Sequence, residues 1–269
     1  RGCPIMSCKG DWRGRSEAKD VVRERAWAAL EASGDARDDD GPRGRIPDFV
    51  GAEEAAAALA ETPEWQQARV VKSNPDPPQA PLRRRALEEG KTVYVPVPQL
   101  TEDTPFLKLD PAALKAKGVA VADAATAAGA ARHGEGVRFD QMEKFDIAIV
   151  GSVAVAREGA RLGKGGGFAD LEMGIFRHYG WVTPGETPIV TTVHPTQLVD
   201  GVLSAALDEW DVPLDLICCP GEVIRTQTAL PQPTKTVSWS AVRPDQFRDI
   251  PFLTELRREM DGLFAHDNS

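Results

Sequence analysis

The residues best suited to chemistry lie in one ten-residue stretch, 161–170, which reads RLGKGGGFAD. Its glycine run, 165–167, lets backbone N–H groups approach an anion without interference from a Cβ. A helix is expected to begin near Phe168, and its positive end favours negative charge at the same place. A short apolar run, Phe145 to Val150, precedes the stretch and has the composition of a buried parallel strand. The pattern predicts a phosphate site; the alternative is a bare turn between strand and helix.

Three charged side chains favour the phosphate interpretation of this stretch. Arg161 and Lys164 add two cations beside the glycines. Asp170 falls in the first helical turn, where a carboxylate can hold a divalent metal ion against the same phosphates. Asp170 could instead do no more than offset the helix dipole.

A second pair of cations, Lys19 and Arg23, stands four residues apart near the start of the chain. On a helix the two side chains share a face, where like charges cost about 0.2–0.5 kcal/mol. Arginine suits bidentate oxygens and lysine acts as a point charge, so together they could neutralise a triphosphate. The alternative is a solvated helix face.

These motifs together resemble the 5-formyltetrahydrofolate cyclo-ligase (5,10-methenyltetrahydrofolate synthetase) family. The family signature RLGxGGGYYD corresponds to residues 161–170, and its Lys-x-x-x-Arg pair corresponds to Lys19 and Arg23. The strand GKTVYVP at 90–96 and the turn DVPLD at 211–215 follow in the family's order, so the resemblance covers about 16–220. Phe168-Ala169 replaces the Tyr-Tyr of the signature, and KSNPDPP at 72–78 replaces its acidic substrate-binding segment, which indicates a divergent branch.

The resemblance implies a three-layer α/β/α, Rossmann-like fold with a mostly parallel sheet and ligands at the carboxyl ends of the strands. It also implies an ATP-dependent and Mg²⁺-dependent cyclo-ligase that converts 5-formyltetrahydrofolate to 5,10-methenyltetrahydrofolate through a phosphorylated formyl group. Lys19, Arg161 and Lys164 would be the catalytic cations, and Asp170 and Asp211 the metal ligands. The expected nucleotide-binding residues are Lys19, Arg23, Arg161, Leu162, Gly163, Lys164, Gly165, Gly166, Gly167 and Phe168.

Two other functions remain open. The phosphate chemistry would serve an ATP-dependent enzyme acting on another amide or carboxyl substrate. It would also serve a nucleotide-binding regulatory protein without turnover, because the folate half of the site has lost its tyrosines.

The remaining sequence predicts elements that alternate as in βαβ units. Helices are expected from Ser16 to about Ala32, over 52–61 and 81–89, and strands over 70–72, 92–97, 188–193 and 215–219. A final helix is expected over 244–263. We expect a flexible segment over 1–15, one α/β domain over 16–220, and a C-terminal arm over 221–269 that packs on the domain or on a partner subunit.

Composition excludes several classes. A net charge of −9 and a pI near 5.1 argue against a nucleic-acid binder. No apolar run reaches the roughly 18 residues of a membrane span, and the start lacks a signal-peptide core, with Met6 a candidate initiator. Four cysteines without zinc spacing fit the cytoplasm. The expected partner is a small molecule, possibly a reduced folate, with no nucleic acid and no membrane, and the expected state is a monomer or homodimer.

Overall fold

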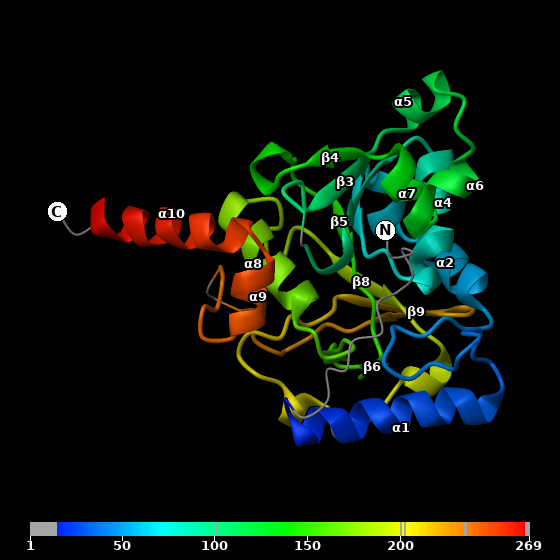
Figure 1. Cartoon of the computed structure of the whole chain (residues 1–269). Helices are drawn as coiled ribbons and strands as arrows, with labels where there is room; N and C mark the ends of the chain where they lie inside the picture. The colour runs from blue at the N-terminus through cyan, green and yellow to red at the C-terminus, as the bar shows by residue number, and fades with distance from the viewer. Residues whose placement is uncertain (1–14, 101, 200, 202, 234–235, 267–269) are drawn as a thin grey trace.

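The computed structural model describes residues 15–266 apart from 101, 200, 202 and 234–235 (Figure 1). The predicted flexible segment 1–15 lies outside the described residues except for Arg15, as do Cys3, Met6 and Cys8.

An eight-stranded sheet forms the centre of the molecule. Its order is β10 (Glu222–Arg225), β9 (Leu216–Cys219), β8 (Ile189–Thr192), β5 (Ile147–Ile149), β1 (Val70–Ser73), β2 (Thr92–Pro96), β3 (Phe106–Leu109) and β4 (Glu135–Val137). The five strands from β9 to β2 run parallel, and β3, β4 and β10 pair antiparallel. The predicted mostly parallel sheet is confirmed, whereas its three antiparallel strands were not predicted.

Helices cover both faces of the sheet, which gives the three layers expected. They are α1 (Glu17–Ser33), α2 (Ala52–Ala60), α3 (Pro63–Gln67), α4 (Ala80–Glu88), α5 (Pro111–Ala116), α6 (Val121–Ala124), α7 (Ala127–His133), α8 (Phe168–Tyr179), α9 (Pro244–Asp249) and α10 (Phe252–His266). One apolar core joins the sheet to α8 and α10, and another joins it to α2, α4 and α7. A third joins α1 to the small hairpin of β6 (Ala154–Val155) and β7 (Arg161–Leu162).

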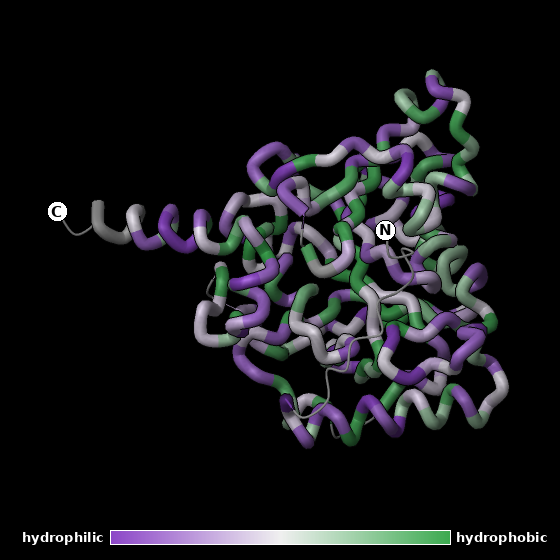
Figure 2. Tube along the Cα trace, in the orientation of Figure 1, coloured by the Kyte–Doolittle hydropathy of each residue, from purple (hydrophilic) through white to green (hydrophobic). Residues whose placement is uncertain are grey.

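Lys19 and Arg23 lie on the buried face of the first helix and not on its solvent face. Ser16 caps α1 by accepting from the Lys19 N–H, and Gly34 ends it in the left-handed conformation. The buried face holds Val22, Ala26 and Leu30 and, at the same spacing, Lys19 and Arg23. Figure 2 shows hydrophilic and hydrophobic residues alternating along this helix. The cations therefore point toward the body of the protein.

The C-terminal segment departs from the prediction of one helix over 244–263, which is wrong. The chain forms α9 and α10 instead, separated at Ile250 and Pro251. Proline lacks an N–H and its ring clashes with the preceding turn, so a continuous helix cannot pass this point. Leu253, Leu256 and Met260 of α10 are buried in the main core, while the far end of α10 extends away from the body (Figure 1).

Two cysteines lie in the described part of the chain, and both are packed in the sheet. Cys218 and Cys219 of β9 are buried and unbonded to each other. Burial raises the pKa of the Cys218 thiol to about 12 and that of Cys219 to about 11. They are therefore neutral thiols that fill space, as expected for small apolar groups.

Candidate functional site

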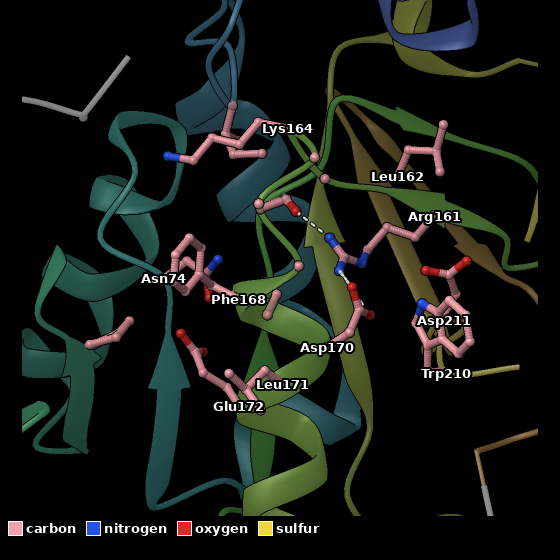
Figure 3. Close-up of a pocket in the computed structure, with 18 of the residues that line it drawn as sticks. Asn74, Arg161, Leu162, Lys164, Phe168, Asp170, Leu171, Glu172, Trp210 and Asp211 are labelled. Carbon is pink, nitrogen blue, oxygen red and sulfur yellow. Dashed lines mark hydrogen bonds and ion pairs between the residues drawn. The ribbon is translucent and has the colours of Figure 1, made fainter. Parts of the chain in front are cut away.

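A cleft of about 1070 Å³ opens at the carboxyl ends of β1, β2 and β5. Its walls include Asn74–Pro77 after β1, Pro96–Pro98 after β2, Gly151 after β5 and the loop that leads into α8 (Figure 3). Ligands of open α/β sheets bind at this edge. The volume suits two medium-sized molecules better than one ion.

Every site residue expected from the sequence lines this cleft. They are Lys19, Arg23, Arg161, Leu162, Gly163, Lys164, Gly165, Gly166, Gly167, Phe168, Asp170 and Asp211. The fold thus joins α1, the glycine loop and the turn at 208–211, although these lie up to about 190 residues apart. Nine basic and seven acidic side chains line the cleft, an excess of cations in a chain of net charge −9. A polyanion is the ligand that this local balance favours.

Three arginines that also line the cleft hold the glycine loop through its carbonyl groups. Arg23 Nε donates to the Gly163 carbonyl at 2.8 Å, Arg15 Nη1 to Gly165 at 2.9 Å, and Arg243 Nη1 to Gly166 at 2.5 Å. In a trans peptide the N–H points opposite to the carbonyl of the preceding residue. The N–H groups of the next residues therefore point away from these guanidinium groups, which leaves them able to donate to an anion.

The loop requires glycine at two of its positions. Gly165 has φ 105° and Gly167 has φ 70°, conformations that a residue with a Cβ rarely adopts. Gly167 is also the N-cap of α8, which has no side-chain cap. The first N–H groups of this twelve-residue helix therefore face the cleft mouth, where an anion can accept from them.

Lys164 and Arg161 differ in how they meet the cleft. The Lys164 ammonium is 3.9 Å from Asp76 Oδ1 and its side chain is 23% exposed. Arg161 is 3% exposed in its side chain, donates to the Gly151 carbonyl at 2.9 Å and lies 3.3 Å from both Asp170 oxygens. Figure 3 shows Lys164 pointing away from Arg161, toward the side where Asn74 lies. Lys164 is the accessible cation, and Arg161 ties the loop after β5 to the first turn of α8.

Leu162, also expected to contact nucleotide, lies mainly in the apolar core between α1 and the small hairpin. Its side chain is 2% exposed. Any contact with a ligand comes from its backbone or from an edge of the side chain.

Lys19 and Arg23 reach the site already bound to acidic groups. Lys19 Nζ lies 2.7 Å from Asp208 Oδ2 and 2.5 Å from Asp211 Oδ2. Arg23 Nη1 donates to Asp20 at 2.7 Å, and burial lowers the pKa of its guanidinium without making it neutral. These cations are fixed in position before any ligand arrives.

The two carboxylates expected to bind metal lie next to each other. The Val212 N–H donates to Asp170 Oδ1 at 3.1 Å, so Asp170 contacts the residue after Asp211. Burial, and then the charge of Asp170, raise the pKa of Asp211. Within the described residues no group of three or more His, Cys, Asp or Glu side chains could hold a metal alone. Two adjacent carboxylates fit Mg²⁺ that completes its shell with phosphate and water.

The structure adds site residues that the sequence did not single out. Arg15 and Arg243 reach the loop across 150 and 77 residues of chain. Arg83 is fully buried and donates to the carbonyls of residues 74, 75 and 76, which fixes the segment after β1. Burial lowers the pKa of this guanidinium to about 10, so it stays charged. No local pattern marks the contacts of Arg15 and Arg243, because their partners are distant in sequence.

Comparison with known proteins identifies the family of the chain. The model of the 5-formyltetrahydrofolate cyclo-ligase family matches residues 15–220. The chain belongs to this family. It is a family of ATP-dependent ligases. The match ends before the segment that supplies Arg243, so this cleft has a wall outside the family region.

The relatives place the chain among cyclo-ligase-like proteins. The methenyltetrahydrofolate synthase domain-containing protein of Mus musculus is 39% identical over 243 residues, 89% of this chain and 63% of that protein. The Homo sapiens protein of the same name is 33% identical over 89% of this chain and 61% of that protein. The chain thus spans about three fifths of the length of these relatives.

Matches to the named enzymes are shorter or more distant. The 5-formyltetrahydrofolate cyclo-ligase of Escherichia coli K12 is 34% identical over 82 residues, 30% of this chain and 40% of the enzyme. The solved 5,10-methenyltetrahydrofolate synthetase of Aquifex aeolicus is 19% identical, with a TM-score of 0.47 over 79% of this chain and 95% of that one. In the described part of this cyclo-ligase family member, no helix combines the length and apolarity of a membrane span.

Proposed function

We propose that the chain converts 5-formyltetrahydrofolate to 5,10-methenyltetrahydrofolate in a reaction that consumes ATP and depends on Mg²⁺. The observation that carries the proposal is the glycine loop at the cleft, whose carbonyls accept hydrogen bonds from Arg15, Arg23 and Arg243. Its N–H groups and the partly exposed side chain of Lys164 are suited to the β- and γ-phosphates of ATP.

The reaction needs no side-chain nucleophile. The formyl oxygen attacks the γ-phosphorus, and the bond from that phosphorus to ADP breaks. The N10 lone pair then attacks the formyl carbon, the carbon–oxygen bond breaks and inorganic phosphate leaves with its electrons. Loss of the N10 proton leaves the N5–C–N10 methenyl cation. The residues contribute by positioning the two substrates and by neutralising phosphate charge.

Asp170 and Asp211 are the residues that would hold Mg²⁺. When bound, the ion would neutralise phosphate oxygens beside the glycine loop. Lys19 lies against Asp211, and Arg161 lies against Asp170. These two cations reduce the electrostatic repulsion between the two carboxylates. They would also stay near the phosphates of bound ATP during the transfer of the phosphoryl group.

The folate half of the site is where this chain differs from the signature. The Arg243 guanidinium carbon lies 5.8 Å from the centre of the Phe168 ring. Ala169 is half-buried. Tyrosine hydroxyls are missing from both positions, and each lost hydrogen bond to a polar ligand costs about 1–3 kcal/mol. We therefore expect slow turnover, which the double change Phe168→Tyr with Ala169→Tyr should increase.

The test is formation of the methenyl chromophore from 5-formyltetrahydrofolate with Mg-ATP. The proposal expects one phosphate released per ring closed and no product without ATP. If ATP binds but neither the wild type nor the double-tyrosine variant makes product, the folate assignment is wrong. Phosphate release stimulated by another amide or carboxylate would then indicate a different ligase substrate, and binding without any release would indicate a regulatory protein.

A further inference from the structure

A buried ion pair joins Glu172, which lines the cleft, to Lys72 behind it, and it has no part in the phosphate chemistry above. Lys72 of β1 is 0% exposed and Glu172 of α8 is 4% exposed. Lys72 Nζ is 2.7 Å from Glu172 Oε2 and also donates to Asn74 Oδ1. Glu172 and Asn74 both line the cleft, Glu172 in the second turn of α8 and Asn74 directly after β1.

The sheet directs Lys72 toward α8. Lys72 is in register with Tyr94 of β2 and Ala148 of β5, which both belong to the core on the α8 side. Its neighbour Val71 belongs to the core on the other side, as the alternation of a strand requires. In Figure 3 the Glu172 side chain leaves α8 on the side of Asn74 and Phe168.

Stability alone does not account for this pair. Removing two charges from water costs desolvation free energy that their mutual attraction rarely exceeds. Apolar residues of similar size often stabilise a core at least as well. Burial raises the pKa of Glu172, while the Lys72 charge opposes that rise. A lysine placed in a central apolar strand therefore serves to keep a carboxylate charged at the wall of a cleft.

We propose that Glu172, held by Lys72, recognises the 2-amino-4-oxopyrimidine ring of the substrate, the ring of a reduced pterin. This inference rests on the proposed function and names the residue that selects the folate. A carboxylate only accepts, and the ring offers two adjacent donors, its 2-amino group and the neighbouring ring N–H. Glu172 Oε2 is buried against Lys72, so the other oxygen of this carboxylate is the one left to accept from the ring. Because Asn74 Oδ1 accepts from Lys72, the Asn74 amide is left to donate, which suits the 4-oxo group.

The acidic group thus comes from α8 rather than from the segment after β1. In that segment KSNPDPP stands where the family has its acidic residues, and Asp76 there lies toward Lys164. Glu172 is therefore a specificity residue supplied by another element, with Lys72 as its positioning residue.

The test compares two ligands that differ at one group. Pterin carries the 2-amino group, and lumazine carries an oxygen in its place. Titration of the full chain should show wild type binding pterin at least about tenfold more tightly than lumazine. Glu172→Gln should abolish that preference and leave Mg-ADP affinity within about twofold. Equal binding of both ligands by wild type, or a preference kept in Glu172→Gln, overturns the proposal.

Two further variants distinguish a specific loss of ligand preference from a loss of the fold. Lys72→Met with Glu172→Gln removes both buried charges together, so it should fold and should also lose the preference. Glu209→Gln removes an acidic group that is exposed in the same cleft, and it should keep the preference.

A last pair of ligands shows whether the ring that Glu172 recognises belongs to a pterin or to a purine nucleotide. Guanine carries the same edge as pterin, and hypoxanthine lacks its 2-amino group. A Glu172-dependent preference for pterin that persists with Mg-ADP bound supports recognition of the folate. A Glu172-dependent preference for GTP over ITP without pterin binding would overturn the pterin assignment. Neither outcome depends on methenyl formation, so failure of the proposed reaction is seen separately.

Discussion

At the scale of single residues, the cleft separates cations that bind a ligand from cations that hold the protein together. The Lys164 side chain lines the cleft and is 23% exposed, whereas Arg161 is buried between Gly151 and Asp170. The sequence motif contains both residues and does not distinguish their roles. Their different burial in the structure distinguishes them.

Lys164→Ala should weaken Mg-ATP binding by about 1.5–3 kcal/mol, the worth of a charge-assisted hydrogen bond, with little change in stability. Calorimetry measures the affinity and urea denaturation the stability. Arg161→Ala is the matched comparison and should lower the unfolding free energy by about 1–3 kcal/mol, because the buried Gly151 carbonyl loses its donor and the half-buried Asp170 loses its cation. The reverse pattern, with Arg161 affecting binding alone, would contradict this assignment.

Asp211→Asn should separate function from stability. Burial and the charge of Asp170 raise the pKa of Asp211, so the folded state favours its protonated form. Its stabilising contribution is therefore complete below the pKa of the unfolded chain and is lost as pH rises through the higher folded pKa. At pH 7 the Asn variant should be at least as stable as wild type while losing Mg²⁺-dependent ATP affinity.

The measurement is urea denaturation of both proteins at pH 7 and near pH 4, with ATP titrations with and without Mg²⁺. Relative to the variant, wild type should gain stability at the lower pH. A variant that is less stable at pH 7 and keeps its Mg²⁺ dependence would show that Asp211 serves the fold.

At the scale of elements, α8 organises the site because it contacts both the glycine loop and the C-terminal segment. A Cβ on Gly174 would lie 2.1 Å from the Thr236 carbonyl oxygen, so the two backbones meet closely there. Arg177 of α8 lies 3.5 Å from the same oxygen. This contact places the segment that supplies Arg243 to the loop.

Gly174→Ala should therefore push the C-terminal segment away from α8. We expect a loss of about 1–3 kcal/mol of stability, as for other overpacked sites, together with weaker ATP binding. Gly262→Ala on α10 is the control, since nothing lies within 4 Å of its added Cβ and helix propensity favours alanine by about 1 kcal/mol. Thermal denaturation and calorimetry follow both effects, and equal behaviour of the two variants would refute the close contact.

Local signals account for the elements that could be predicted. Ser16 and Gly34 mark the ends of α1, and apolar β-branched runs mark the parallel strands. The strands β3, β4 and β10 are set by antiparallel pairing with neighbours and were missed. Site residues were found where they cluster in one motif or share a helix face. Arg243 was not found, because long-range packing alone brings it to the glycine loop, and Glu172 was not singled out, because its partner Lys72 is distant in sequence.

At the scale of the whole molecule, the core continues beyond the region that the family model matches. Strand β10 pairs with β9, and Val237, Ile250 and Leu256 are buried in the same core as α8. The chain after residue 220 thus contributes to stability as well as to the wall of the cleft.

A chain that ends at residue 220 should not reach the stability of the full chain. Removing the later residues exposes the core face of α8 and leaves β9 without its antiparallel neighbour. Each fully buried aliphatic side chain contributes about 1.5–3 kcal/mol, so loss of several exceeds the usual net stability of a domain. Circular dichroism and thermal denaturation of both chains test this, and a truncated chain that melts cooperatively at the same temperature would show the later residues to be dispensable.

The arginines around the glycine loop also determine when its flexibility is lost. Glycines have more conformational freedom in an unfolded chain than other residues, and fixing a backbone residue costs about 1–2 kcal/mol. Arg15, Arg23 and Arg243 fix the loop through contacts within the protein, so this entropy is lost on folding and not on binding. Phosphate affinity is thereby coupled to the order of two remote segments, α1 and the C-terminal region. Conditions that loosen either segment should weaken nucleotide binding well before the sheet itself unfolds.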